Sequence, residues 1–229
     1  MASVFFSLML GTLIGFIPTF GLLYLITSRY EKVIQEEDTM KTFVIGIFLG
    51  IAVTLGHLYV ISALDPQNTG PFVISAYLLA LAEALLWRIY IRRRKFRDRP
   101  DRPFIILSLS LGITGLFLLF TSGQLFSQFE TTSDQLLGFF LFAIAVSTMR
   151  GSMALLLSRG EMKGRSLMQM ALITVVFGTF NIFSLIYLAY EFLWTFALFL
   201  VIPGLVSFAL FYPDLGKVKK DSQVDDTGV

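Results

Sequence analysis

Residues 79–96 read LALAEALLWRIYIRRRKF, an apolar run that contains one glutamate, Glu83, and ends at a block of basic residues. A charged side chain at the centre of a bilayer costs about 3 kcal/mol on insertion scales. Nearly 20 apolar residues followed by a basic block are typical of a membrane helix that ends at the cytoplasmic surface. Glu83 is therefore expected to have either a function or a partner of opposite charge.

The composition extends this interpretation to the whole chain. Of the 229 residues, 55% are hydrophobic and 15% are charged, and the mean hydropathy is +0.76, which is too apolar for a soluble domain. Seven segments are apolar on every face, and each is near the ~20 residues that cross ~30 Å of hydrocarbon. We therefore predict an all-α bundle of seven transmembrane helices in one domain, residues 1–216. The predicted spans are 3–27, 42–64, 71–91, 104–126, 136–157, 167–189 and 192–212.

The basic residues predict the orientation, because cytoplasmic links are enriched in Lys and Arg. The links at 64–70, 128–135 and 190–191 contain neither residue, whereas the alternate links and the tail are basic. The N-terminus is thus expected outside and the C-terminus in the cytoplasm, with a disordered polar tail at 217–229. The basic face either attracts anionic lipid headgroups or only sets the topology. We expect a multi-pass protein of the plasma membrane in a prokaryote, or of an endomembrane in a eukaryote.

Several kinds of chemistry are excluded by the residues that the chain lacks. It has no cysteine and a single histidine, His57, so neither a Cys-ligated metal nor a His₂Glu zinc site can be assembled. No aspartate lies within a predicted span, which excludes a buried Ser–His–Asp triad and an aspartyl dyad. No Gly-rich phosphate-binding loop is present. We expect no metal, no cofactor and no nucleic-acid partner.

Four polar side chains lie deep in the predicted spans: His57, Glu83, Arg150 and Asn181. A rise of ~1.5 Å per residue places Glu83 about 18 Å and Arg150 about 21 Å from the outer ends of their spans. These similar depths predict an ion pair between spans three and five, because a paired charge is less costly than a lone one. Arg88 is a competing partner, but at i+5 on the same helix it points elsewhere.

His57 and Asn181 share a level nearer the outer surface by the same calculation. They either hydrogen-bond to each other or find local partners. An acid–base pair of His57 with Glu83 is conceivable, although the two differ in depth by about 6 Å.

Two spans carry glycines at i and i+4, which allow helix backbones to approach closely. Gly11 and Gly15 form the first pair, and Gly46 and Gly50 form the second. We interpret both as packing within one bundle, in preference to a dimer interface.

Four strings in chain order resemble the PrsW family of intramembrane proteases, which belongs to a wider group with the CAAX-prenyl/bacteriocin-processing proteases and the Aph subunit of gamma-secretase. LAEALLW at 81–87 resembles the family's Leu-Glu-Glu-x-Leu-Lys-Trp signature, and VVFGTFN at 175–181 is similar to its Leu-His-Gly-x-x-Asn/Asp signature. The other two strings are LLYLITSRYEKVIQEEDTMKTFVIGIFLG at 22–50 and SLSLGITGLF at 108–117. The start of the chain, VFFSLMLGTLIGFIPTFGLLYLIT at 4–27, is also similar to the start of the Aph subunit.

The resemblance keeps few of the family's polar residues. Glu83, Gly178 and Asn181 match, but the first signature glutamate falls on Ala82 and the signature lysine on Leu86. The family's Glu-Asn pair falls on Phe117 and Leu118, and its two histidines fall near Met149 and on Phe177.

The resemblance thus implies a fold of the PrsW and Aph type with a degenerate site. Three functions remain open. The first is a non-catalytic scaffold or stabilising subunit for another membrane protein, as the Aph subunit is. The second is an intramembrane protease with an altered site centred on Glu83. The third is a small transporter or channel lined by the four deep polar residues, for which the chain shows no repeat symmetry.

Overall fold

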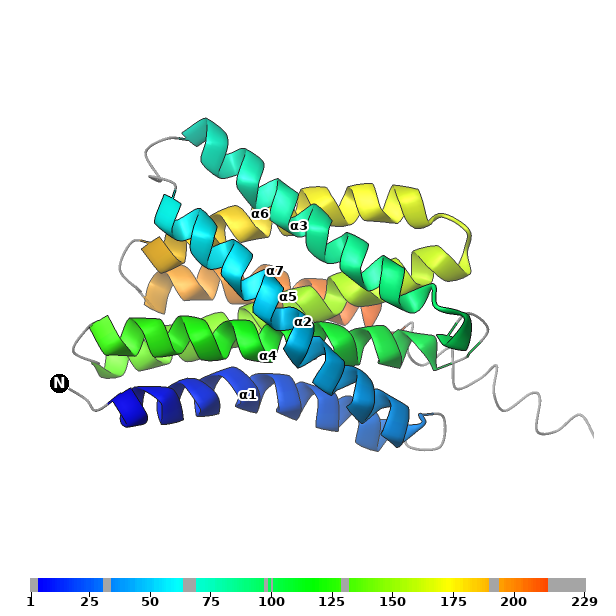
Figure 1. The fold of residues 1–229 in the computed structure, drawn as a ribbon, viewed down its shortest axis with the longest axis horizontal. Coiled ribbons are helices and arrows are strands. Elements are labelled where there is room, and N and C mark those ends of the chain that lie inside the picture. Colours follow the sequence, from blue (N-terminus) through cyan, green and yellow to red (C-terminus); the bar gives the residue numbers. More distant parts are fainter. Residues whose placement is uncertain are drawn as a thin grey trace, which may run out of the picture.

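A computed structural model describes residues 4–30, 34–63, 69–96, 99, 101–128, 132–189 and 194–213. All regular structure in these residues is helical (Figure 1). The α-helices are α1 (Val4–Arg29), α2 (Glu36–Ala63), α3 (Thr69–Ile91), α4 (Arg102–Gln128), α5 (Ser133–Met162), α6 (Ser166–Ala189) and α7 (Trp194–Phe211). A short 3₁₀ helix, η1 (Arg94–Phe96), lies between α3 and α4.

The predicted all-α class is confirmed, and each of the seven predicted spans coincides with one helix. Helices α1 to α6 are long and apolar enough to cross a membrane, and α7 is a shorter apolar helix. The chain is therefore a multi-pass helical membrane protein. The predicted tail at 217–229 lies outside the described residues.

Helices α2 and α5 extend furthest beyond the spans predicted from hydropathy, because polar residues continue them past the hydrocarbon. Helix α2 begins six residues early, with Glu36, Glu37 and Asp38 in its first turn, where negative charge stabilises the helix dipole. Helix α5 begins at a capping box in which Thr132 accepts a hydrogen bond from the Gln135 amide. Hydropathy marks the apolar centre of a helix and misses such ends.

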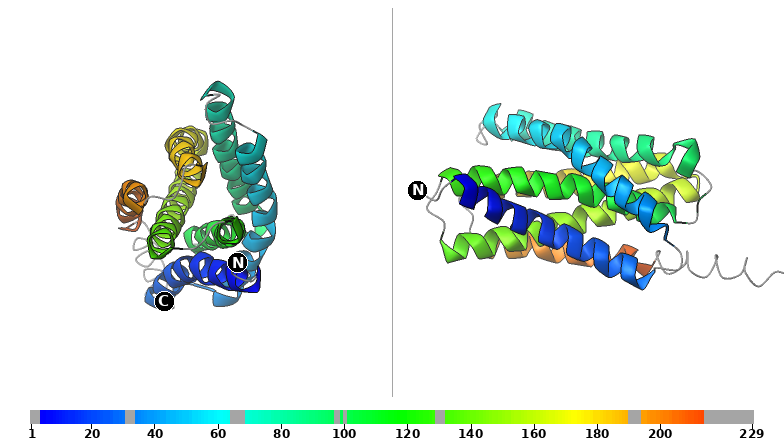
Figure 2. Two further views of the ribbon diagram at one scale, coloured as in Figure 1. Left: turned by 90° about the vertical axis from the view of Figure 1, so that its left-hand side faces the viewer. Right: turned by 60° about the horizontal axis from the view of Figure 1, so that its bottom comes forward.

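Helices α4 and α5 form the centre of the bundle, with 89% and 83% of their membrane-spanning residues buried. Helices α1 and α2 pack on α4, α7 packs on α5, and α3 pairs with α6. Figure 2 shows α7 on the outside of the bundle, next to α5, and α2 crossing the other helices obliquely in its right-hand view. We call the end at which α1, α3 and α5 finish the basic end; it lies on the right in Figure 1.

Glycines bring α1 and α2 against α4. A Cβ at Gly46 would overlap the Leu109 carbonyl oxygen, and a Cβ at Gly112 would overlap that of Phe43. Gly15 meets the backbone of α4 in the same way, with the Leu119 nitrogen 2.8 Å from its ideal Cβ position.

Gly50 also faces α4, so three of the four predicted glycines pack within the bundle, as expected. Gly11 lies in α1, but its surroundings are outside the described residues.

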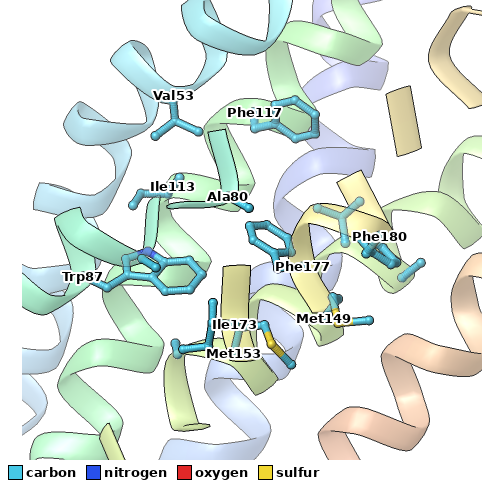
Figure 3. Packing of buried hydrophobic residues seen from close by; sticks show 14 of the residues in the cluster. Val53, Ala80, Trp87, Ile113, Phe117, Met149, Met153, Ile173, Phe177 and Phe180 are labelled. Atoms are coloured by element: carbon cyan, nitrogen blue, oxygen red, sulfur yellow. The ribbon is translucent and has the colours of Figure 1, made fainter. Parts of the chain in front are cut away.

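The largest buried cluster joins α3, α4, α5 and α6 through aromatic side chains. Figure 3 shows the Phe177 ring in the middle of this cluster, with Trp87 on one side and Phe180 on the other. The ring centroids of Trp87 and Phe177 are 6.0 Å apart, and those of Phe177 and Phe180 are 6.4 Å apart. Of these three rings, Phe177 also contacts the buried Arg150 guanidinium.

Candidate functional site

The two opposite charges in the middle of the bundle form a direct contact. Arg150 on α5 donates a hydrogen bond from Nη2 to Oε1 of Glu83 on α3 over 2.8 Å. Each side chain is only 1% exposed. The ion pair predicted from helix depths is therefore present. Arg88 does not compete for Glu83, because its Nε donates to Glu161 instead.

Two phenylalanine rings flank the Arg150 guanidinium. Its central carbon lies 4.6 Å from the Phe117 ring centroid and 5.7 Å from that of Phe177. Both distances are within the range in which a cation is attracted to the face of an aromatic ring, and the attraction is stronger where water is excluded. Phe117 and Phe177 are also two of the positions at which the family resemblance implies polar catalytic residues. In this structure they hold the arginine.

His57 on α2 joins the pair, which the depth estimate did not predict. Its Nε2 lies 3.7 Å from Glu83 Oε1, and its ring packs 5.0 Å from Phe117. The sequence analysis left this pairing open at an estimated depth difference of about 6 Å. The two side chains bridge that difference, and α2 crosses the bundle obliquely. The other ring nitrogen, Nδ1, is 2.9 Å from the Val53 carbonyl oxygen. That contact assigns the Nδ1–H tautomer to a neutral ring.

Asn181 is buried, but no described hydrogen bond connects its side chain to Glu83, Arg150 or His57. Its Nδ2 has no hydrogen-bond partner among the described residues, so the alternative of an Nδ2 bond to His57 is not formed. Its neighbour Gly178 packs directly under the Tyr77 ring of α3. The Gly178–Asn181 turn thus lies at the α3–α6 contact.

The pair is sparsely hydrogen-bonded for two buried charges. Glu83 Oε2, Arg150 Nε and Arg150 Nη1 have no hydrogen-bond partner among the described residues. Within the same residues, no group of three His, Asp or Glu side chains could hold a metal ion. The site therefore consists of one carboxylate, one guanidinium and one imidazole enclosed by aromatic rings.

A second charged centre at the basic end was missed by the sequence analysis. Glu161, near the end of α5, accepts hydrogen bonds from Arg88 Nε at 2.9 Å and from Arg92 Nε at 3.0 Å. Arg102 Nη2 lies 3.8 Å from the same carboxylate. Arg88 and Arg92 also donate to the Ser166 hydroxyl. We call these five residues the Glu161 cluster; they link the ends of α3, α4, α5 and α6.

A third centre ties the start of α2 to the link before α4. Lys95 donates to Asp38 over 2.6 Å, and Arg99 bonds both Asp38 and Asp101. Its hydrogen bonds, with Asp101 first and Asp38 next, hold the pKa of the Arg99 guanidinium above its ordinary value. We call these four residues the Asp38 cluster. The link between α3 and α4 was interpreted from the sequence as a signal of orientation. Many of its basic residues also form ion pairs within the protein.

A groove of about 590 Å³ lies between α5, α6 and α7. Met149 and Phe180, both buried, line it together with the exposed Phe183 and Phe199. Met149 is the residue before Arg150, so the groove lies one residue from the buried ion pair along α5. We call this the α5–α6–α7 groove.

The fold and the site define a multi-pass helical membrane protein with a buried charge centre between α2, α3 and α5. No protein-family model, no curated protein and no solved structure matches the chain. The resemblance to the PrsW family is therefore neither supported nor opposed by these comparisons.

Proposed function

We propose that the chain is a non-catalytic, PrsW/Aph-like membrane protein that acts as a scaffold or stabilising subunit for another membrane protein. In this proposal α7 is a seventh span, since 18 residues extend about 27 Å. The N-terminus lies outside and the basic end faces the cytoplasm, as the distribution of Lys and Arg favours. The membrane is the plasma membrane in a prokaryote or an endomembrane in a eukaryote.

The observation that best supports this proposal is the set of contacts that Glu83 makes. A carboxylate that activates water must reach that water and must have neighbouring groups that stabilise the developing oxyanion. Glu83 instead binds Arg150, and phenylalanine rings cover the guanidinium where the resemblance implies polar groups. This arrangement supports a structural role in which the pair joins α3 to α5.

The α5–α6–α7 groove supports a partner in the membrane. Phe183 and Phe199 on its rim are 47% and 74% exposed. The hydroxyl of Ser207 in its lining is a group that forms hydrogen bonds between membrane helices, whereas that of Thr179 already donates to the Val175 carbonyl oxygen. We therefore assign the groove to a transmembrane helix of the partner protein.

Site-specific photocrosslinking in native membranes tests this proposal. A photoreactive residue at Phe199 is expected to give one stoichiometric crosslinked species, identified by mass spectrometry and mild-detergent pull-down. The same residue at Ile74 on α3, which is 60% exposed but outside the groove, is the matched control and is expected to give only lipid adducts. Equal protein crosslinking from both positions, or none from Phe199, would contradict a docking site in the groove.

An intramembrane protease centred on Glu83 is the second candidate, and the position of His57 favours it. An imidazole nitrogen 3.7 Å from a carboxylate oxygen is too far for a hydrogen bond, but catalytic hydrogen bonds are often long in a site without substrate. If this candidate is correct, Glu83→Gln abolishes cleavage of a membrane substrate, because the amide cannot act as a base. We expect no such cleavage from the wild-type protein. Cleavage that depends on Glu83 in a folded variant would replace the scaffold proposal.

A further inference from the structure

The two charged clusters at the basic end differ in their net charge. The Asp38 cluster contains two cations, Lys95 and Arg99, and two carboxylates, so it is neutral. In the Glu161 cluster, Arg88 and Arg92 share a single carboxylate, so these two guanidiniums bring one more positive charge than Glu161 offsets. The surplus charge of this paired network is thus concentrated at one place.

The Glu161 cluster lies where apolar helices end. Arg88 and Arg92 are at the end of α3, and Glu161 is at the end of α5, whereas Arg102 and Ser166 begin α4 and α6. Four helix ends at the boundary of the apolar bundle coincide with the depth at which lipid headgroups lie. The cluster therefore faces headgroups and not hydrocarbon.

The arginines differ in how far they are exposed. The side chains of Arg88 and Arg102 are 17% and 8% exposed, and that of Arg92 is 53% exposed. Arg88 and Arg92 both direct Nη2 at the Ser166 hydroxyl, over 3.1 and 3.3 Å, so their guanidiniums converge on one point. Converging guanidinium groups bind phosphate oxygens with good geometry, because each presents a planar fork of N–H donors.

We propose that the Glu161 cluster binds the phosphate of an anionic phospholipid headgroup, with Arg92 as the exposed contact. The positive charge of Arg88 and Arg92 that Glu161 does not offset is complementary to an anionic headgroup. The internal ion pairs with Glu161 fix the positions of the arginines before the lipid arrives, which lowers the entropic cost of binding. This inference is independent of the scaffold role and of any activity at Glu83.

The test measures lipid retention by the purified full-length protein. Native mass spectrometry after exchange into mixed micelles of phosphatidylglycerol and phosphatidylcholine reports how many anionic lipids stay bound. We expect Arg92→Gln to weaken phosphatidylglycerol binding about fivefold, the effect of one basic residue near an anionic surface. Arg92→Lys keeps the charge and is expected to retain most of the binding.

The matched control is Arg94→Gln, since Arg94 is an exposed arginine of the same link and has no ion pair among the described contacts. It removes the same charge from the same face and is expected to leave lipid retention unchanged. Equal losses in Arg92→Gln and Arg94→Gln would show a diffuse charge effect and overturn the site, as would no loss in Arg92→Gln.

A further experiment adds inorganic phosphate to the protein, once with bound phosphatidylglycerol and once without anionic lipid. The proposal predicts that phosphate alone neither displaces phosphatidylglycerol nor raises the melting temperature. If it does both, and Arg92→Gln removes the effect, the ligand is the free ion and the lipid assignment is wrong. The melting temperature of each variant without anionic lipid also shows that it is folded.

Discussion

Replacing either member of the buried ion pair alone is expected to destabilise the protein by about 3–5 kcal/mol, because the remaining charge is left without its partner in an apolar interior. Glu83→Leu leaves the Arg150 guanidinium unpaired, and Arg150→Met leaves the Glu83 carboxylate unpaired. In the double variant both charges are gone and apolar side chains fill the space. The double variant should therefore recover most of the loss, which reversible unfolding in detergent micelles measures.

The wild type, the two single variants and the double variant form a double-mutant cycle, and its coupling free energy tests whether Glu83 and Arg150 interact directly. A coupling free energy of about 2 kcal/mol or more is expected for a direct buried pair. For independent sites, the losses of stability from the two single substitutions would simply add. The exposed pair Glu37–Lys41, at i and i+4 on α2, provides the matched control and should show little coupling, since its side chains are 80% and 63% exposed. Strictly additive losses at Glu83 and Arg150 would rule out a direct interaction.

Adding one methyl group at the α2–α4 contact is expected to have the second large effect. In Gly46→Ala the new Cβ would overlap the Leu109 carbonyl oxygen, and backbone atoms cannot move aside as a flexible side chain does. The two helices must separate, with the loss of neighbouring contacts. We expect a destabilisation of about 2–3 kcal/mol, within the range for overpacked cores, measured by the same unfolding titration.

Gly21→Ala is the control for this substitution. Gly21 is also within a helix, α1, but no atom outside its own turn lies within 4 Å of a Cβ placed there. Alanine should stabilise the helix at that position by about 0.5–1 kcal/mol, because glycine loses more backbone freedom on folding. If Gly46→Ala were as harmless as Gly21→Ala, the close approach of α2 and α4 would not be essential to the fold.

Among the deep polar residues, the Glu83–Arg150 contact was predictable because the estimated depths of the two residues along their helices are similar. The His57–Glu83 contact was left open, because an estimate of depth along two helix axes includes neither the reach of the side chains nor the oblique path of α2. The flanking of Arg150 by Phe117 and Phe177 could not be predicted from their spacing. In the sequence each is one apolar residue among many in an apolar span, and only the packing of α4 and α6 brings their rings to one guanidinium.

The charged links between the helices also show what a sequence can and cannot predict. Their composition indicates which end is basic, because that depends only on counting Lys and Arg along the chain. It does not show that three arginines lie around Glu161. Arg88, Arg92 and Arg102 lie at the end of α3, directly after it and at the start of α4, and each is 59 or more residues from Glu161 in the chain. Ion pairs over such separations form only after the helices have packed.

The sequence by itself determined the helices and the class of protein, because burial of apolar residues in hydrocarbon and backbone hydrogen bonding within one segment are local properties. It also predicted an ion pair between Glu83 and Arg150 from their similar depths. The tertiary structure decided which residues surround that pair, where the charges at the basic end cancel and where they do not, and where α6 and α7 leave a groove. Those outcomes depend on helix crossing and side-chain packing, which join residues that the chain keeps far apart.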